Sequence, residues 1–567
     1  MAAFGFLSAG RILVAFILLW LLLIFFVGGP MFRRDPDGPV LPDDTILVRL
    51  AKASSELKSL KSQNEELRNM IETLIPLKNV ISPSALSSHA LVSSPATGPS
   101  VQYETSIRKA IFDVSELWNY VRRHLNASQK EFVSEIRHSI LYDLKVASQR
   151  DEDWRSDQLK SLQQSVQSVI SKLQNPVACD KAQKLVCVLN KGCGFGCQIH
   201  HVVYCFVVAL AENRTLILNA RNWRYADRDH KRSKTAGWNA VFQPLSTSCL
   251  EEGEGKHSGW LPGHDSAQIL ELPIIDSMRP RPEFLPLAVP AQIADRLEHV
   301  HGSPIAWFLG QILRYSMRLS EDMEQFIADA KYKLNFRTPI VGIHVRRTDK
   351  VGSEAAFHPL SEYMKLVQDY YGSLQLERSR TGNKEAIEKL VYLATDDPGI
   401  WTKEVPEWEE RGFSFLGDAE VANSAGIGTR YAADSLRNVI LDIWLLSQCD
   451  HLVCTFSSQV CRVAYELMQT RSLNGTSPDW SQAFNSLDDI YYFGGQSDHD
   501  QVAILKHVSR AEGELDMDIG DTIGIAGNHW DGFSKGINRR SYDSGVYPGF
   551  KTAEIVKKAH FKAFDGL

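Results

Sequence analysis

The 567-residue sequence predicts an α/β protein with two facing halves, which follow an anchored stem and precede a β-rich C-terminal segment. Three observations predict this architecture. Short apolar strands alternate with helical segments from about residue 180 to about residue 470, which is typical of parallel α/β layers. An uncharged apolar run lies near the N-terminus, and short strands and turns replace the alternation beyond about residue 488.

Composition excludes several classes of protein. Lys and Arg number 62 against 68 Asp and Glu, which gives a net charge of −6. A protein that binds nucleic acid over a broad surface needs a basic balance, so no nucleic-acid partner is expected. Apolar residues at 44% and aromatic residues at 10% are those of a globular protein, and the length allows three or four structural units.

The first segment predicts a membrane anchor. No charged residue occurs between Arg11 and Arg33, and residues 12–32 are long enough to span a bilayer. A cleaved signal peptide is the alternative, but the run is longer than a usual apolar h-region and no clear A-x-A site follows it. We therefore expect a cytoplasmic tail at 1–11, a signal-anchor at 12–32 and the remaining chain in a lumen.

Residues 33–100 predict a stem. Apolar residues over 46–74 recur in alternating steps of four and three, and the one polar member of this heptad seam, Asn64, favours two strands. A solvated amphipathic helix is the alternative. A second region of helical spacing follows at 101–176, so we expect a homodimer formed through the helical stem.

The body is predicted to contain two α/β halves, at 177–335 and 336–487, that face each other across a cleft. The expected strands are Leu185–Leu189, Val202–Leu210, Thr215–Leu218, Pro339–Val345, Leu390–Thr395 and Leu452–Cys454. Residues 488–560 then carry an acidic loop, an alternating strand and a closing Gly545–Pro548 segment. This order resembles an SH3-like β-barrel, although a fold does not by itself define a function.

The cysteines indicate an oxidising compartment. None of the nine precedes Cys179, and six lie between Cys179 and Cys249. A metal site would need paired C-x-x-C motifs, whereas Cys193 and Cys197 form a C-x-x-x-C motif with no second matching pair. Disulfides fit this pattern better, and an odd count leaves at least one thiol unpaired.

The most informative segment is a buried strand that ends in a burst of charge, from His344 to Lys350. Ligands of open α/β sheets bind beyond the carboxyl ends of the strands. Because alternate residues face opposite sides of a strand, one arginine of the pair Arg346–Arg347 is able to face a phosphate while the other braces the fold. The alternative is that both arginines pair with structural carboxylates.

Two further segments are suited to an anion. Residues 452–468 turn from a strand into a helix with Ser457 or Ser458 as N-cap, and free amides at a helix N-terminus bind anions. The glycine-rich turn at 189–197 lets backbone amides approach a pyrophosphate, or it forms a tight loop between two cysteines. Together with an arginine, these segments predict a site that binds a nucleotide diphosphate and neutralises its charge as a leaving group.

Carboxylates supply the remaining predicted chemistry. Glu354, on the loop that leaves the arginine strand, is the candidate base for an attacking sugar hydroxyl, with a solvated loop residue as the alternative. Asp442 lies among apolar residues and is suited to accept from the N–H groups of a base. Asp396 and Asp397 follow a strand and are the alternative metal site, since a metal neutralises a leaving group as an arginine does.

Four segments resemble the Golgi α-1,6-fucosyltransferase family, which adds core fucose to N-glycans. They are His344–Gly352, Cys454–Glu466, Ser486–Gly495 and Gly527–Gly536, and the likeness runs from about Cys179 to Tyr547. It implies a type II Golgi membrane protein with a lumenal, GT-B-like catalytic domain of two Rossmann-like halves and a C-terminal SH3 domain. The implied reaction is inverting and metal-independent, uses no cofactor, and moves fucose from GDP-β-L-fucose to O6 of the innermost Asn-linked GlcNAc of N-glycoprotein acceptors.

The resemblance also implies a role for each matching residue. At the reacting atoms it places Glu354 as the base together with Arg346, Lys350 and Asp349. For the donor it implies Arg346 and Ser458 at the diphosphate, His344 and Asp442 at the guanine and Tyr225 at the nucleotide, with Gln459 and Gly194 as further donor-binding residues. For the acceptor it implies Lys191, Asp276, Glu354, His529 and Lys535. The implied disulfides are Cys179–Cys249, Cys187–Cys205, Cys193–Cys197 and Cys454–Cys461, with Cys449 free.

Other functions stay open at this point. The same donor half would serve fucosylation of a protein or a chito-oligosaccharide acceptor, and an anchored helical stem is also how a non-enzymatic Golgi scaffold is built. One segment departs from the family pattern, a charged insertion at 227–235 directly after the Tyr225 motif, for which we expect a solvated loop.

Overall fold

The structure is a computed structural model that describes residues 98–567, except residues 222, 226–235, 262, 275–276, 286, 349–350, 352–355, 427, 430, 474–478 and 493–499. The predicted signal-anchor, the heptad segment and the charged insertion lie outside the described residues. Four predicted site residues also lie outside them, and these are Asp276, Asp349, Lys350 and Glu354.

The region expected to be helical, 101–176, forms three helices. They are α3 (Val101–Val121), α4 (Ala127–Gln149) and α5 (Glu152–Gln174). Asn126 and Gln129 form a capping box at the start of α4. Leu162, Val166 and Ile170 of α5 are fully buried in the core of the first half, so α5 is part of the body rather than a free-standing stem.

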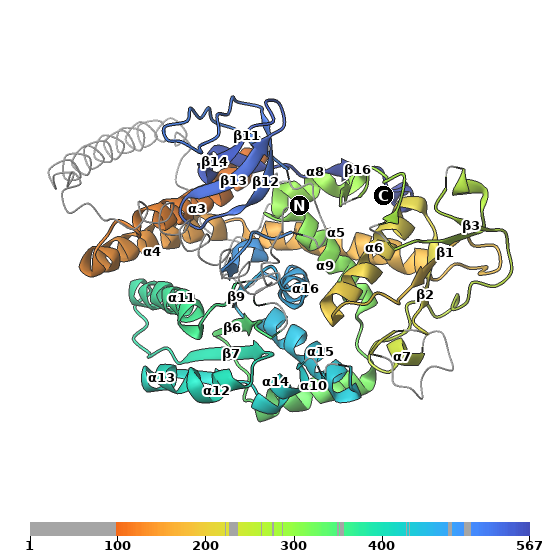
Figure 1. Cartoon of the computed structure of the whole chain (residues 1–567), viewed down its shortest axis with the longest axis horizontal. Coiled ribbons are helices and arrows are strands. Elements are labelled where there is room, and N and C mark those ends of the chain that lie inside the picture. Colours follow the sequence, from red (N-terminus) through yellow and green to blue (C-terminus); the bar gives the residue numbers. More distant parts are fainter. Residues whose placement is uncertain are drawn as a thin grey trace, which may run out of the picture. The chain divides into compact units, whose positions relative to one another are not determined.

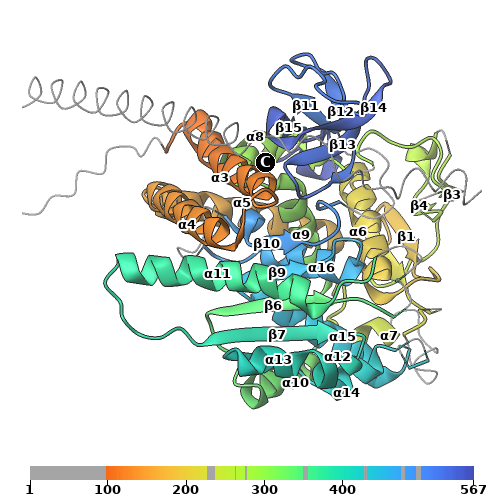
Figure 2. The same cartoon turned by 60° about the vertical axis from the view of Figure 1, so that its left-hand side comes forward.

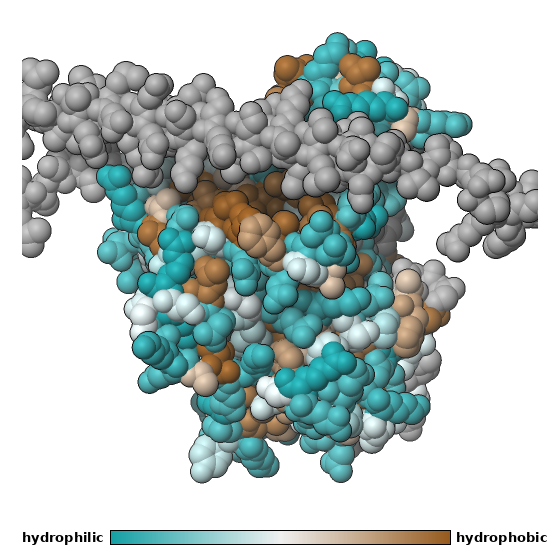
Figure 3. Space-filling view, turned by 90° about the vertical axis from the view of Figure 1, so that its left-hand side faces the viewer, coloured by the Kyte–Doolittle hydropathy of each residue, from teal (hydrophilic) through white to brown (hydrophobic). Residues whose placement is uncertain are grey.

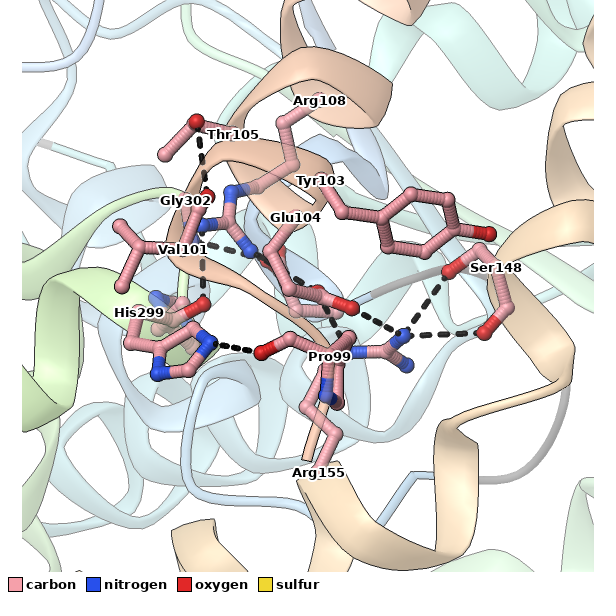
Figure 4. A network of polar contacts seen from close by, with 12 residues as sticks. Pro99, Val101, Tyr103, Glu104, Thr105, Arg108, Ser148, Arg155, His299 and Gly302 are labelled. Carbon is pink, nitrogen blue, oxygen red and sulfur yellow. Dashed lines mark hydrogen bonds and ion pairs between the residues drawn. The ribbon is translucent and has the colours of Figure 1, made fainter. Parts of the chain in front are cut away.

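A buried ion-pair network fixes these helices to one another and to the body (Figure 4). The Glu104 carboxylate of α3 accepts hydrogen bonds from Arg155 of α5 at 3.0 and 3.2 Å and pairs with Arg108 at 3.4 Å. Arg155 also donates to the Ser148 carbonyl at 2.9 Å, and Arg108 donates to the His299 carbonyl at 3.1 Å. Glu104 is 2% exposed and Arg155 is 1% exposed, so each charge depends on its partners.

The first half contains a parallel four-stranded sheet in the order β2-β1-β4-β3. Its strands are β1 (Lys184–Val188), β2 (Thr215–Asn219), β3 (His257–Gly259) and β4 (Ile269–Glu271). Around it lie α6 (Phe195–Glu212), α7 (Ala236–Asn239), the short strand β5 (Val289–Pro290), α8 (Ala291–Val300) and α9 (Pro304–Ser316). The next helix, α10 (Glu321–Lys333), packs against the second half, where Lys331 donates to Gln448 at 2.6 Å.

One predicted strand of this half is wrong, because Val202–Leu210 lies inside α6. Among the described residues α6 is the one helix long and apolar enough to cross a membrane, and 89% of that stretch is buried inside the molecule. A helix covered on all sides has no polar face, so its sequence lacks the helical period and reads like a buried strand.

The second half contains a parallel five-stranded sheet in the order β10-β9-β6-β7-β8. Its strands are β6 (Ile340–Val345), β7 (Lys389–Thr395), β8 (Phe413–Leu416), β9 (His451–Cys454) and β10 (Phe484–Ser486). The helices are α11 (Leu360–Arg380), α12 (Gly399–Lys403), α13 (Val405–Glu410), α14 (Ala419–Ser424), α15 (Ala433–Gln448) and α16 (Gln459–Met468). Figure 2 shows α11 running beside β6 and β7.

The two halves meet at α16, which lies with α6 and α9 between the two sheets (Figure 1). Two glycines allow this contact. A Cβ atom at Gly196 of α6 would lie 2.7 Å from the carbonyl carbon of Gln459, and a Cβ atom at Gly310 of α9 would lie 2.2 Å from the carbonyl oxygen of Glu466. Since real Cβ atoms do not approach backbone so closely, only glycine lets α16 pack at this depth.

The C-terminal segment forms an antiparallel five-stranded sheet in the order β14-β13-β12-β11-β15, with Ile523 and Tyr547 in its small core. Its strands are β11 (Asp500–Ala503), β12 (Thr522–Asn528), β13 (Phe533–Asn538), β14 (Ser544–Pro548) and β15 (Thr552–Glu554). We expected this unit to extend to residue 560, but the chain returns to the first half earlier. There β16 (Lys558–Ala559) pairs with β5, and Phe561 and Phe564 join the large core.

The four disulfides implied by the resemblance are present, and Cys449 is a buried free thiol. Cys193–Cys197 closes the glycine-rich turn before α6, and Cys454–Cys461 joins the end of β9 to the first turn of α16. Two of the disulfides therefore lie on the segments predicted to bind an anion.

The buried network makes Glu104 a strong determinant of stability. We expect Glu104→Gln to lower the free energy of unfolding by about 3–5 kcal/mol, because the change removes the buried carboxylate that pairs with both Arg155 and Arg108. Urea denaturation followed by tryptophan fluorescence measures the effect, with Glu131→Gln at an exposed position of α4 as the control. Equal midpoints for the two variants would contradict the prediction.

Candidate active site

Several of the predicted site residues lie at the carboxyl edge of the second sheet, which we define as the residues that directly follow β6, β7 and β9. These strands are neighbours and run parallel, so their carboxyl ends meet. Arg346 follows β6, Asp396 follows β7, and the turn to α16 follows β9. The expected grouping of the arginine strand with the helix N-terminus is therefore present.

Asp396 organises the start of the arginine loop. Its carboxylate is 4% exposed and accepts hydrogen bonds from the backbone amides of Arg347 at 2.8 Å and of Thr348 at 3.1 Å. The same carboxylate pairs with the Arg346 guanidinium and accepts from the Thr348 hydroxyl. Arg346 is thus oriented at the sheet edge by a buried counter-charge, with 17% of its side chain exposed.

Arg347 braces the fold, as expected for one arginine of the pair. Its guanidinium donates to Glu404 at 2.5 and 3.1 Å, to Asp397 at 3.1 Å and to the His358 carbonyl at 2.8 Å. Burial by itself lowers the pKa of Arg347, but the hydrogen bonds to Glu404 and Asp397 outweigh it and raise the pKa above its ordinary value. This side chain is 6% exposed and is occupied by protein carboxylates.

His344 lies on the face of β6 that packs against α15, and Asp442 is a residue of α15. His344 is buried, its Nδ1 atom has no hydrogen-bond partner among the described residues, and desolvation lowers its pKa to about 4, so the ring is neutral at physiological pH. Asp442 of α15 accepts from the Tyr392 hydroxyl at 2.7 Å, and burial raises its pKa to about 7. A neutral imidazole and a buried carboxylate are residue types suited to the polar edge of a base.

Two helix N-termini converge near this edge. α16 begins after Ser458, whose side chain is buried and makes no capping hydrogen bond, and α6 begins after Gly194, where a Cβ atom would meet nothing within 4 Å. The Gly196–Gln459 approach brings the first turns of the two helices together. Their partial positive charges therefore add at one place, which favours an anion.

A carboxylate already occupies part of the α16 turn. The Ser457 amide donates to Asp488 at 3.3 and 3.4 Å, and the Ser486 hydroxyl donates to the same carboxylate at 3.0 Å. Sequence reasoning missed this role of Asp488, although the residue lies within one of the four segments that carry the family resemblance.

Gln459 is held from the first half. Its side-chain oxygen lies 2.6 Å from Nδ1 of His200, whose Nε2 atom lies 2.9 Å from Glu466, and the Tyr491 hydroxyl donates to Glu466 at 2.6 Å. His200 and Glu466 are 3% and 0% exposed. Sequence reasoning missed this network. The available signal was His200, a polar residue in an otherwise apolar run, because a buried polar side chain needs a hydrogen-bond partner.

Tyr225 lies in an aromatic cluster that reaches across the two halves. Its ring packs 5.7 Å from Phe195, the first residue of α6, and 5.0 Å from Tyr431, which precedes α15. Arg224 lies over the Tyr431 ring at 4.7 Å and donates to its hydroxyl at 3.2 Å. The structure therefore places Tyr225 beside the start of α6, where the nucleotide was predicted.

The described residues that were predicted to contact the acceptor lie on segments other than the carboxyl edge of the second sheet. Lys191 lies on the turn after β1, where its carbonyl accepts from the Gln198 side chain at 2.8 Å. His529 and Lys535 are exposed at the β12–β13 turn and on β13. The Trp530 indole of that turn donates to the Asp488 carbonyl at 3.3 Å, which connects the small sheet to the α16 turn.

The alternative metal site, Asp396 and Asp397, is built differently from a cation site. Both carboxylates accept hydrogen bonds from arginines and backbone amides, so their oxygens point at donors. Across the described part of the chain, two clusters have metal-ligand geometry. One contains the disulfide pair Cys187–Cys205 with His201, and the other is Glu212, His264 and Asp265, so neither belongs to this edge.

Comparisons with known proteins identify the family. The family model described as "Alpha-(1,6)-fucosyltransferase N- and catalytic domains" matches residues 3–492. An alpha-(1,6)-fucosyltransferase of Drosophila melanogaster is 44% identical over 490 residues, which cover 83% of this chain and 76% of the relative. The chain belongs to the alpha-(1,6)-fucosyltransferase family. As a member of this family it is a glycosyltransferase that transfers fucose.

Further known proteins match this fucosyltransferase over about half of its chain or more. An alpha-(1,6)-fucosyltransferase of Caenorhabditis elegans is 35% identical over 533 residues and covers 91% of each chain. The structure of NodZ alpha-1,6-fucosyltransferase co-crystallised with GDP matches with a TM-score of 0.29 at 14% identity and covers 50% of this chain and 91% of that one. The structure of POFUT1 in complex with GDP-fucose matches with a TM-score of 0.31 at 11% identity and covers 55% of this chain and 99% of that one.

The raised pKa of Asp442 predicts a pH dependence of GDP binding to this fucosyltransferase. Above pH 7 the carboxylate is charged, as the role predicted for it at the N–H groups of guanine requires, and below pH 7 it is protonated. We expect the affinity for GDP to fall by up to about tenfold for each pH unit below 7.

Calorimetry of GDP binding between pH 5.5 and 8.5 measures this dependence. Asp442→Asn should bind GDP weakly over the whole pH range and should lack the fall in affinity that this carboxylate causes. Titration of the GDP phosphate affects the affinity of all variants equally. Asp434→Asn, at an exposed position in the first turn of α15, is the control. A pH profile of Asp442→Asn parallel to that of the wild type would refute the assignment.

Proposed function

We propose that this fucosyltransferase moves L-fucose from GDP-β-L-fucose to O6 of the innermost Asn-linked GlcNAc of N-glycans, with inversion at the fucose C1 atom. One observation carries the proposal: an arginine oriented by a buried carboxylate lies at the same sheet edge as the α16 N-terminus, which meets the α6 N-terminus. This arrangement suits a diphosphate that must gain charge as it leaves.

The donor binds with its guanine at His344 and Asp442, its nucleotide beside Tyr225 and its diphosphate at Arg346, Ser458, Gln459 and Gly194. His344 is neutral and Asp442 is the acceptor, so together they match a base edge that presents both a donor and an acceptor. The Arg346 guanidinium neutralises the departing GDP.

The reaction is a single displacement. The acceptor O6 attacks C1 of fucose, the C1–O bond to the β-phosphate breaks, and the electron pair leaves with GDP. Glu354 takes the O6 proton as general base, and Asp349 and Lys350 position the acceptor or adjust that carboxylate. Lys191, Asp276, His529 and Lys535 contact the acceptor glycan. No cofactor takes part, and arginine supplies the charge that a metal would otherwise provide.

The proposal also includes the membrane location, the compartment and the oligomeric state of the enzyme. Residues 12–32 anchor it in the Golgi membrane as a type II protein with a lumenal, GT-B-like catalytic domain, and the small C-terminal sheet is an SH3-like domain. Four disulfides support an oxidising lumen. Exposed apolar side chains of α3 and α4 support a homodimer through the helical region. Figure 3 shows the molecule from that side. The exposed apolar side chains include Leu117, Phe132, Ile136 and Ile140.

Transfer of labelled fucose to an agalacto biantennary N-glycopeptide tests the proposal. In the presence of EDTA we expect activity for the wild type. We expect losses of at least about 100-fold for Arg346→Ala, which removes charge stabilisation, and for Glu354→Gln, which removes the base. GDP binding should weaken mainly in Arg346→Ala, and Arg411→Ala, an exposed pair with Glu407, is the control.

Three outcomes would overturn parts of this proposal. If EDTA inactivates the wild type and added Mn²⁺ restores its activity, a metal at Asp396 and Asp397 would replace Arg346 as the group that neutralises the diphosphate. Preference for a protein or a chito-oligosaccharide acceptor over the glycopeptide would replace the acceptor. Full activity of Glu354→Gln would exclude that residue as the base.

A further inference from the structure

Helix α3 holds the turn of the small sheet that carries His529. This turn, residues 529–532, joins β12 to β13, and it contains Trp530 with a φ of 53° and Gly532 with a φ of 88°. A non-glycine residue in the left-handed region persists only where its surroundings fix it. The contacts that fix this turn come from segments far away in the sequence.

On one side the turn is bound by arginines of the α3 C-terminus. Arg123 donates to the Asp531 carboxylate at 3.1 Å and to the His529 carbonyl at 3.3 Å. Arg122 donates to the Trp530 carbonyl at 3.3 Å. Three consecutive residues of the turn therefore each accept a hydrogen bond from the end of one helix.

Packing supports these polar contacts. A Cβ atom at Gly532 would lie 2.9 Å from the Cβ atom of Tyr120, and the Tyr120 ring lies 6.3 Å from that of Phe533. On the opposite side, the Trp530 indole donates to the Asp488 carbonyl, and the Asp488 carboxylate accepts from the Ser457 amide at the α16 turn. The turn is thus held between α3 and the donor half.

We infer that Arg123 is a positioning residue for the acceptor glycan, and that α3 acts on fucose transfer by setting the orientation of the turn 529–532. This inference rests on the proposed function, in which His529 contacts the acceptor. The helical region then has a part in acceptor recognition in addition to its part in stability.

The contacts of Arg123 separate positioning from stability. The turn has hydrogen bonds of its own, because the Asp531 carboxylate accepts from the Phe533 amide at 3.0 Å and the His529 amide donates to the Phe533 carbonyl at 3.0 Å. The Arg123 side chain is 51% exposed, so its removal leaves no buried charge and has little effect on stability. The turn should still form in its absence but should lie in a different place relative to α16.

Steady-state kinetics with the glycopeptide acceptor and GDP-fucose tests this inference. For Arg123→Ala we expect the acceptor KM to rise by about tenfold or more, because small displacements of a contact residue weaken binding strongly. The donor KM, the affinity for GDP and the melting temperature should stay unchanged. Arg123→Lys, which keeps a charge, should recover part of the loss, and Trp530→Phe, which loses the indole N–H, should also raise the acceptor KM.

Two reference variants make the result specific. Arg539→Ala removes an exposed pair with Asp500 at 3.0 Å in the same small sheet without contact to the turn, and it should leave the acceptor KM unchanged. In the double variant Arg123→Ala/His529→Ala, the acceptor KM should be close to that of His529→Ala alone. The effects of two residues that act through one another are not additive.

The outcomes separate the inference from the proposed function. If His529→Ala raises the acceptor KM and Arg123→Ala does not, the inference fails and the acceptor role of the turn stands. If His529→Ala has no effect, the acceptor role fails and the inference fails with it. Equal losses in donor and acceptor parameters together with a lower melting temperature would show a purely structural role for Arg123.

Discussion

The close approach of α16 to the helices of the first half is the constraint on which the site depends. Gly196 and Gly310 remove the two Cβ atoms that would keep α16 away, at backbone positions of Gln459 and Glu466. The buried His200–Glu466 contact at 2.9 Å then adds a polar link across the same boundary. The two helix N-termini meet because these backbones touch, and an anion site follows from their position.

Charge at the carboxyl edge is balanced before any ligand arrives. Asp396 orients Arg346 from a buried position, while Glu404 and Asp397 occupy Arg347. Fixing a guanidinium in this way removes the cost of orienting it during the reaction, which is how preorganised electrostatic stabilisation works. The adjacent arginines thus have different tasks, because one is 6% exposed and enclosed by carboxylates and the other remains at the edge.

The enzyme completes its site with segments that flank the two halves. The Glu104 network attaches α3 to α5 and to the last turn of α8, and the α3 C-terminus then meets the turn of the small sheet. The chain end returns to the first half through β16 and Phe561. Residues 98–174 and 500–567 are therefore joined to the body by buried contacts, and these segments fix the position of the 529–532 turn.

The sequence by itself determined the local elements and the chemistry. Strand ends at Val345, Thr395 and Cys454 follow from short apolar runs with charge or turns after them, and the arginine pair, Ser458 and Asp442 were recognisable as residue types suited to a nucleotide diphosphate. Tertiary structure decided the rest. That α6 is a helix, that Asp488 binds the α16 turn and that α3 holds the 529–532 turn all depend on contacts between residues far apart in sequence, and local periodicity carries no information about such partners.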